Sequence, residues 1–388
     1  MNLTDNIFFK NFKKTSNSKK LKKILLSLLN QENQIINSLR KSYKDSWKKV
    51  DIKKYKKFSN INLIGMGGSI MGSKSIYSFL KKKIKKKFFF IDNFEHNEIN
   101  NLNKKNTLNL IISKSGNTLE TIVNSNILMN PKSKNIFITE NKDNYLRHLA
   151  NKMKSEVIDH NNYIGGRYSV LSEVGMLPAH LMGLDVEKFR NLNQLIKNKY
   201  FLEGLIKNVK NIIDLSKKKK SNSIILNYDE KSLDLFYWYQ QLVAESLGKK
   251  SKGILPIVSK MPQDNHSLMQ FYLDGRKNSF YTFFFTLEKK SKKIKNHQLL
   301  KSRNYLKNKD LNSIIYSQYI ATQNVFTKKK IPFRSFLIKK RNEQSLSELF
   351  TFFVLETILL GKALKINPYD QPSVELIKSE TKKKLINL

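Results

Sequence analysis

The sequence predicts an α/β protein of two doubly wound domains, each with a mainly parallel sheet flanked by helices. Short runs that are apolar almost throughout, such as residues 108–112, are typical of strands buried on both faces. These runs alternate along the chain with segments of helical periodicity, which is the pattern of parallel sheets covered on both sides. A length of 388 residues is enough for two such domains.

A helical, lysine-rich stretch at 190–220 separates two groups of expected strands. We expect residues 1–58 to form a helical N-terminal extension packed on the core, because apolar residues recur there at helical spacing. Residues 59–195 would form the first domain, and residues 196–388 the second, with a C-terminal helix. The expected strands are 61–64, 88–92, 108–112 and 136–139 in the first domain, and 223–228, 254–258, 280–285 and 332–338 in the second.

The composition excludes several kinds of site and argues against others. There is no cysteine, which rules out disulfides, thiol nucleophiles and cysteine metal sites. Lys and Arg number 72 against 31 Asp and Glu, a formal net charge of +41. The lysines are spread over the whole length, and arginine, which favours bidentate phosphate and base contacts, is scarce. We therefore expect no specific nucleic-acid partner, although a basic surface attracts anionic substrates.

No segment has the pattern of a membrane span or a secretory signal. The longest apolar stretch, residues 350–364, contains Glu356 and Lys362 and is too short to cross a bilayer. Residues 24–29 are apolar, but no small-residue cleavage site follows them. We expect no membrane association and a cytoplasmic location.

A polar turn follows the strand expected to end at residue 112, and helical periodicity resumes after it. The backbone N–H groups of a helix start are unpaired and carry partial positive charge, which suits a phosphate. The turn adds hydroxyls, a lysine and a glycine that lets the backbone approach a ligand. The alternative is an ordinary turn whose hydroxyls only cap the helix. The residues concerned are Ser113, Lys114, Ser115, Gly116 and Thr118.

A glycine-rich turn follows the first expected strand. A dinucleotide fingerprint needs glycines at its first, third and sixth positions, but Ile70 occupies the sixth after Gly65 and Gly67. Gly68 and Ser69 instead indicate close backbone approach to a sugar, with a plain turn before a helix as the alternative. Since ligands of parallel sheets bind beyond the carboxyl ends of the strands, we expect this turn and the first polar turn to share one site.

Three further segments carry candidate functional side chains. Two glycines before Arg167 allow a tight turn that presents one guanidinium, although a surface arginine is the alternative. Gln241 and Glu245 are four residues apart, so they share a helical face. Glu245 could also be a solvated partner of Lys249. His266 lies among amides and hydroxyls, which makes a metal site improbable and a structural role the alternative.

The end of the chain carries the last candidates. Gln371 and Lys378 are seven residues apart, about two helical turns, so a helix would point both side chains in the same direction. The alternative is a tail helix that ends in ordinary lysines.

Taken in order, these six segments resemble those of the glucose-6-phosphate isomerase family, which has the sugar isomerase (SIS) fold. The resemblance covers residues from about 61 to 378. It rests on Gly-Gly-Ser at 67–69, Ser-Lys-Ser-Gly-Asn-Thr at 113–118, Gly-Gly-Arg-Tyr-Ser at 165–169, Gln-Gln-x-x-x-Glu-Ser-x-Gly-Lys at 240–249, Asp-Asn-His at 264–266 and Asp-Gln-x-x-Val-Glu-x-x-Lys at 370–378.

The resemblance implies two SIS-type domains and an aldose–ketose isomerase of glycolysis and gluconeogenesis. It implies interconversion of D-glucose 6-phosphate and D-fructose 6-phosphate through a cis-enediolate. Glu245 would move the proton, Arg167 would stabilise the enediolate, and the side chains that assist ring opening would be His266 and Lys378. The residues implied to bind the substrate are Gly68, Ser69, Ser113, Lys114, Ser115, Thr118, Gln241 and Gln371.

The resemblance also implies that no metal or organic cofactor takes part, because this proton shuttle requires a base and charge stabilisation. It implies a homodimer in which His266 is contributed across the interface. Two positions depart from the family pattern, which often has glutamine in place of Asn265 and glycine in place of Ile377.

Three other functions compete with this one. A bifunctional glucose/mannose-6-phosphate isomerase tends to carry a smaller residue than Gln241, so we expect mannose 6-phosphate to be a poor substrate. A non-catalytic SIS-type sugar-phosphate sensor would not need Glu245, His266, Lys378 and Arg167 together. A polyanion-binding protein would account only for the charge.

Overall fold

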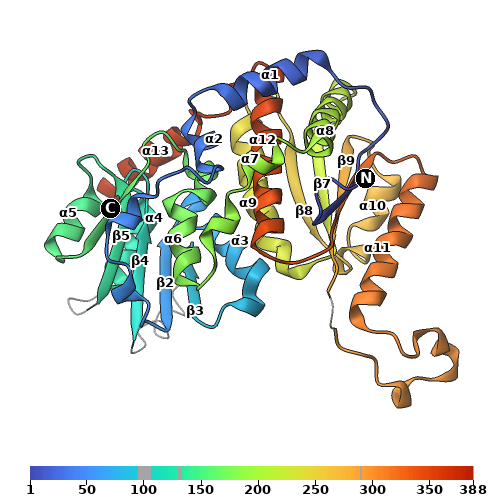
Figure 1. Ribbon diagram of the computed structural model, residues 1–388, viewed down its shortest axis with the longest axis horizontal. Coiled ribbons are helices and arrows are strands. Elements are labelled where there is room, and N and C mark those ends of the chain that lie inside the picture. The colour runs from blue at the N-terminus through green and yellow to red at the C-terminus, as the bar shows by residue number, and fades with distance from the viewer. Residues whose placement is uncertain (95–105, 130–132, 289–290, 388) are drawn as a thin grey trace.

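The computed structural model describes residues 1–94, 106–129, 133–288 and 291–387. Two five-stranded sheets lie side by side, with helices around and between them (Figure 1). All strand pairings within the two sheets but one are parallel. The predicted α/β class, with mainly parallel sheets flanked by helices, is therefore confirmed.

The first sheet is parallel throughout and has the order β3-β2-β4-β5-β6. A ladder of amides crosses its interior, because Asn62 donates to Asn109 at 2.9 Å and Asn109 donates to Asn135 at 3.0 Å. β6 lies at the edge, where polar side chains can alternate with buried ones, and its polarity kept it out of the expected strands. The strands are β2 (Asn60–Gly65), β3 (Lys87–Ile91), β4 (Thr107–Ile112), β5 (Lys134–Glu140) and β6 (Glu156–His160).

The second sheet has the order β1-β10-β9-β7-β8, and only its edge strand β1 is antiparallel. The expectation of a helical extension is wrong at residues 7–10. Ile7 and Phe9 are buried there while their neighbours are exposed, which is strand periodicity, and the ring of Phe9 lies 4.7 Å from that of Phe336. The strands are β1 (Ile7–Lys10), β7 (Asn222–Asn227), β8 (Leu255–Lys260), β9 (Ser279–Thr286) and β10 (Phe333–Ile338).

The α-helices cover both sheets and fill the space between them (Figure 1). α12 is buried from Ser345 to Gly361, as expected of a helix that crosses the core. The helices are α1 (Lys19–Asn30), α2 (Gln34–Ser38), α3 (Met71–Leu80), α4 (Leu119–Leu128), α5 (Tyr145–Lys152), α6 (Glu173–Leu181), α7 (Leu192–Leu195), α8 (Lys199–Lys217), α9 (Leu233–Leu247), α10 (Met269–Asp274), α11 (Leu311–Lys328), α12 (Glu343–Ala363) and α13 (Val374–Ile386).

Helix packing between the sheets brings the two halves together. α3, which follows β2, packs against α9, which follows β7, so the carboxyl ends of both strands lead toward the same region. One apolar core cluster includes Leu63 from the first sheet and Phe284 from the second. We propose that the two sheets mark two domains divided near residue 196, with residues 1–58 packed on both.

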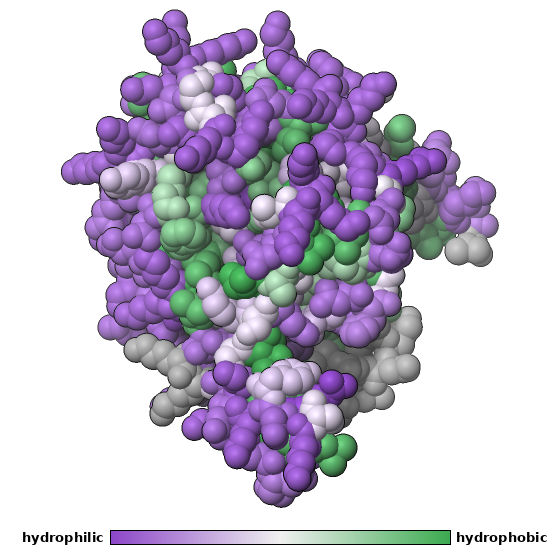
Figure 2. Space-filling model, turned by 90° about the vertical axis from the view of Figure 1, so that its right-hand side faces the viewer, coloured by the Kyte–Doolittle hydropathy of each residue, from purple (hydrophilic) through white to green (hydrophobic). Residues whose placement is uncertain are grey.

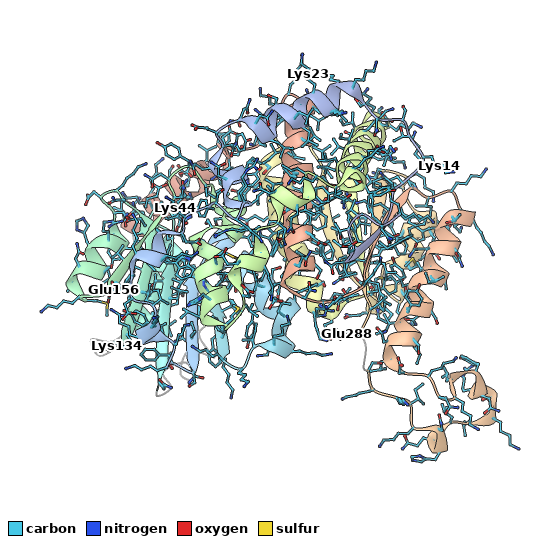
Figure 3. All side chains as sticks on the ribbon, in the orientation of Figure 1. Lys14, Lys23, Lys44, Lys134, Glu156 and Glu288 are labelled. Atoms are coloured by element: carbon cyan, nitrogen blue, oxygen red, sulfur yellow. The ribbon has the colours of Figure 1, made fainter. Side chains whose placement is uncertain are left out.

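The chain is strongly basic, with a formal net charge of +41. The labelled lysines Lys14, Lys23, Lys44 and Lys134 lie at separate places on the molecule (Figure 3). Among the described residues, no helix is long and apolar enough to cross a membrane.

Candidate active site

Arg167 lies at the centre of the contacts that join the candidate residues. It belongs to a 3₁₀ helix, Gly166–Leu171, and its side chain is buried. Its Nε donates to Ser246 Oγ at 2.8 Å, and its Nη2 donates to the carbonyls of Pro368 at 2.9 Å and Asp370 at 3.1 Å. Two segments far from Arg167 in the sequence therefore fix the orientation of this guanidinium.

The remaining nitrogen of Arg167 faces two further candidates. Nη1 lies 3.2 Å from Glu245 Oε1 and donates to Gln371 Oε1 at 2.5 Å. The second carboxylate oxygen of Glu245 accepts from Gln241 Nε2 at 3.0 Å. The side chain of Glu245 is 25% exposed whereas that of Arg167 is 1% exposed, so the carboxylate can be reached from outside. The arrangement combines a fixed cation with an accessible base.

The glycine-rich turn lies against these residues. Gly67 has φ +52°, and a Cβ added there would lie 2.8 Å from Gln241 Nε2. A Cβ on Gly68 would lie 2.1 Å from the carbonyl carbon of Gly166, so the two turns touch through their backbones. Ser69 follows and is buried. This contact brings Gly68 and Ser69 to the turn that presents Arg167.

A cavity of about 270 Å³ opens beside Gln241. An ion pair between Lys74 and Asp92, 2.9 Å apart, lies in its wall. Its volume is close to the lower end of the range for small-molecule pockets. The residues that line it are Met71, Lys74, Asp92, Asp234, Tyr237, Gln240, Gln241 and Ala244.

The polar turn after β4 has the shape expected of a strand-to-helix loop. Gly116 adopts φ +67°, and Thr118 precedes α4. The hydroxyl of Thr118 does not cap α4; it lies 2.9 Å from Ser113 Oγ. Ser115 Oγ accepts from the backbone N–H of Asn117 at 3.3 Å. The capping alternative is therefore wrong for Thr118, whose side chain leaves the amides at the start of α4 to other partners.

Lys114 of this turn is held by residues that the sequence analysis did not select. Its Nζ donates to the carbonyl of Asn162 at 2.7 Å and lies 3.3 Å from Glu140 Oε1. Glu140 ends β5, the neighbour of β4, so strand order alone brings it close to Lys114. The acid at the end of the next strand could have predicted a partner for Lys114. A backbone carbonyl such as that of Asn162 leaves no signal in the sequence.

Two asparagines shape the same turn. A Cβ on Gly116 would lie 1.9 Å from Asn144 Oδ1, and Asn117 Oδ1 accepts from the N–H of Tyr145 at 3.1 Å. Asn144 in turn caps α5 by accepting from the N–H of Arg147. Only glycine fits at position 116, because the loop before α5 lies directly against it.

The structure leaves His266 apart from the residues around Arg167. It follows β8 and the 3₁₀ helix Gln263–Asn265, and its side chain is exposed. Within the described part of the chain, no hydrogen bond or ion pair joins it to Arg167 or Glu245. The His266 side chain is therefore accessible to solvent.

Lys378 is also apart from the site. Its Nζ donates to Glu375 at 2.7 Å on α13, with both side chains about two-thirds exposed. The expectation that Gln371 and Lys378 share a helical face is wrong, because α13 begins only at Val374. Pro372 disfavours helical backbone at Gln371, which instead contacts Arg167.

A buried polar layer supports the loop that holds Lys114. Glu173 Oε1 accepts from the N–H of Asn161 and lies 3.8 Å from His160 Nδ1, while its Oε2 accepts from Tyr43 at 2.9 Å. Burial lowers the pKa of His160 to about 4 and raises the pKa of Glu173 above its ordinary value. A neutral imidazole is therefore the stable form of His160 at neutral pH.

Tyr168 contacts two of the groups that also hold Arg167. Burial raises the pKa of Tyr168 to about 12, and its hydroxyl contacts Ser246 Oγ at 2.8 Å and donates to the carbonyl of Pro368 at 2.9 Å.

Within the described ranges, no three His, Cys, Asp or Glu side chains lie together in a way that could hold a metal ion.

Comparison with known proteins finds one family whose members resemble this chain over most of its length. Residues 26–387 match the family model described as phosphoglucose isomerase. A glucose-6-phosphate isomerase from Methanocaldococcus jannaschii is 32% identical over 348 residues, which cover 84% of each chain. One from Mycoplasmopsis pulmonis is 34% identical over 349 residues, or 82% of this chain and 80% of the relative.

The fold has a counterpart among solved structures. A crystal structure of a glucose-6-phosphate isomerase from Chlamydia trachomatis superimposes with a TM-score of 0.73 at 15% identity. The match covers 98% of this chain and 89% of that chain, so both sheets and the helices around them share the arrangement.

Proposed function

The chain belongs to the phosphoglucose isomerase family and is an aldose–ketose isomerase, and on that premise we propose that it interconverts D-glucose 6-phosphate and D-fructose 6-phosphate. The observation that supports the assignment of the base is the position of the Glu245 carboxylate, between the guanidinium of Arg167 and the amide of Gln241. A partly exposed carboxylate can accept a carbon-bound proton, and a buried arginine can stabilise the charge that develops.

These positions support the following proton transfer. Glu245 removes the proton from C2 of the open-chain aldose and returns it to C1, passing through a cis-enediolate, while the hydroxyl proton moves from O2 to O1. The negative charge of the enediolate oxygen lies near Arg167, whose guanidinium is already oriented by Ser246, Pro368 and Asp370. A preorganised cation stabilises the transition state without the free-energy cost of reorienting it.

The phosphate is held by the turn after β4. In the free protein Ser113 and Thr118 contact each other, and Lys114 contacts Glu140. A phosphate would exchange these contacts for hydrogen bonds from the same hydroxyls, from Ser115 and from the backbone amides at the start of α4. Gly68 and Ser69 approach the sugar through their backbone, and Gln241 and Gln371 contact its hydroxyls.

Ring opening is assigned to His266 and Lys378. Because His266 is exposed and apart from Arg167, we propose that it serves the site of a second copy in a homodimer. Lys378 lies on α13, whose residues are all exposed, and it would reach a site only after α13 moves or meets a partner. The cytoplasmic location stays a prediction.

An assay with purified protein tests the proposal. Fructose 6-phosphate is supplied, and the glucose 6-phosphate formed is detected through a coupled dehydrogenase. Mannose 6-phosphate serves as a comparison substrate in the same assay, and unphosphorylated fructose serves as another, with glucose as the product detected. We expect fast turnover of fructose 6-phosphate and slow turnover of the other two. No turnover of fructose 6-phosphate would contradict the assignment, and equal turnover of mannose 6-phosphate would favour the bifunctional enzyme.

A further inference from the structure

A second cavity lies away from the candidate active site. It has a volume of about 450 Å³, within the range of small-molecule pockets. It lies at the amino ends of β7 and β10, next to the ends of α8 and α11, whereas the active site lies beyond the carboxyl ends of the strands. The lining residues that carry the argument are Lys10, Lys13, Lys218, Lys220, Lys330 and Asp214.

The charges around this cavity are unbalanced. Five lysines face a single acid, Asp214. The carboxyl ends of α8 and α11 each add about half a negative charge, which leaves a surplus of roughly three positive charges. Capping of the helix ends explains Lys218 and Lys330, but it does not explain Lys10 in β1 or Lys13 in the loop after it.

None of the five lysines forms an ion pair with a described residue. By contrast, the neighbouring Lys329 pairs with Asp274 at 2.7 Å. Burial, together with the charges of Lys277 and Lys218, lowers the pKa of Lys220, so the like charges oppose one another. A group of unneutralised cations around a cavity attracts an anion.

Part of the cavity wall is apolar and consists of packed side chains. Phe12 has an edge contact with Phe280 at 5.5 Å, and Lys10 Nζ lies 4.8 Å from the ring centre of Phe333. Leu215, Ile331 and Pro332 complete the apolar lining. Figure 2 views the molecule from the side of α11 and Lys14, where apolar surface shows between hydrophilic side chains.

The lysine-bearing loop is anchored to α8. Asn211 is fully buried, and its Nδ2 donates to Asn11 Oδ1 at 3.1 Å and to the carbonyl of Lys13 at 3.2 Å. Lys210 Nζ donates to Ser16 Oγ at 3.1 Å farther along the same loop. The wall that carries Lys13 is therefore already formed in the free protein, which reduces the ordering cost of binding.

We propose that this cavity binds a small organic polyanion with a flat apolar body, of the nucleoside diphosphate class. The phosphates would contact the lysines, and the base would lie on the lining around Phe12 and Phe333. Inorganic phosphate alone would use the charge but not the apolar wall, and a nucleoside alone would do the reverse. The proposal is independent of the isomerase assignment.

Titration calorimetry on the full chain tests this site with ADP as the probe. We expect one saturable site that binds ADP at least about tenfold more tightly than pyrophosphate or adenosine. A saturating concentration of fructose 6-phosphate should leave ADP binding unchanged. Displacement of ADP by fructose 6-phosphate, absence of saturable binding, or equal affinity for pyrophosphate would each overturn the proposal.

Matched variants locate the site. Lys218→Glu with Lys330→Glu should weaken ADP binding at least about tenfold. Lys217→Glu with Lys328→Glu changes the same two helix ends by the same charge, but neither residue lines the cavity, so affinity should fall less than about twofold. Equal losses in both pairs would overturn the proposal. If the first pair fails to fold, Lys13→Glu in the anchored loop replaces it. Unchanged ADP affinity in that variant would also overturn the proposal.

Discussion

Arg167 Nη1 lies 3.2 Å from Glu245 Oε1, with the guanidinium buried and the carboxylate partly exposed. A carboxylate must be ionised to accept a proton, and its position here points one oxygen at a fixed cation. A sugar that binds against Glu245 would bring its oxygens toward the same cation. This one contact therefore joins the proposed base to the group proposed to stabilise the enediolate.

Replacing Arg167 by lysine should remove most of the activity. A lysine has no planar fork to contact Ser246, Pro368 and Asp370 together, so its charge would be displaced. We expect kcat to fall by roughly 10²- to 10³-fold, as for the loss of one preorganised charge-stabilising group. The control is Arg276→Lys, an exposed arginine, which should behave as the wild type. A fall of kcat by less than tenfold in a folded Arg167→Lys protein would contradict the role.

The polar turn after β4 can be tested through its glycine. Gly116→Ala places a Cβ against Asn144 Oδ1 and strains a residue with φ +67°, so the turn must change shape. We expect KM for the sugar phosphate to rise at least about tenfold, because phosphate binding is lost, with a smaller effect on kcat.

Gly183→Ala is the matched control for that turn. Gly183 also has positive φ, +81°, but no atom lies within 4 Å of an added Cβ. Both variants should lose about 1 kcal/mol or more of stability from backbone strain, which thermal unfolding measures. Only Gly116→Ala should change KM. An unchanged KM in Gly116→Ala would remove the phosphate from this turn.

Mixing two inactive variants tests the shared site. In a mixed dimer of Glu245→Gln and His266→Ala chains, one site carries both changes. The other combines an intact Glu245 with the intact His266 of the partner chain. Co-refolding should therefore restore up to half of the wild-type activity per mixed dimer. If mixed dimers form, as judged by mass, and stay inactive, His266 serves its own chain.

The buried His160 should make stability depend on pH. Its folded pKa of about 4 lies below the ordinary value of 6.5, so the unfolded chain binds more protons between these pH values. Stability is complete above pH 6.5 and falls as the pH drops toward 4. This contribution is roughly 3 kcal/mol.

His160→Gln isolates this contribution in denaturant unfolding at several pH values. The variant should lose less stability than the wild type between pH 6.5 and 4, whatever its stability at neutral pH. Glu173 acts in the opposite direction, because its pKa is raised, but it is present in both proteins. His148→Gln, an exposed histidine, should follow the wild type. If the free energies of unfolding of wild type and His160→Gln fell in parallel with pH, folding would not lower the pKa of His160.

Local chemistry made parts of this structure predictable. Apolar runs without alternation located most of the strands, and the two polar turns lie at strand ends as expected. The strand at residues 7–10 was missed because four residues give little periodicity, and it is stabilised by pairing with β10, far along the chain. Long-range pairing of this kind leaves no local pattern.

The candidate site was also predictable only where a local sequence pattern determines it. Spacing placed Gln241 and Glu245 on one helical face, and the structure joins their side chains. The contact of Glu245 with Arg167 depends on how α9 packs against α3 and the glycine-rich turn, which no local pattern contains. Spacing failed for Gln371 and Lys378, because Pro372 delays the start of α13.

Deuterium exchange reports proton transfer by Glu245 at the reacting carbon atoms themselves. Fructose 6-phosphate in deuterated water is followed by NMR with wild type, Glu245→Gln and Glu203→Gln, a partly exposed control glutamate that pairs with Lys207. We expect wild type and Glu203→Gln to form glucose 6-phosphate and to incorporate deuterium at C1 and C2. Glu245→Gln should lose at least about 100-fold in both rates while it still binds the sugar phosphate. Exchange at the wild-type rate in Glu245→Gln would show that another group is the base.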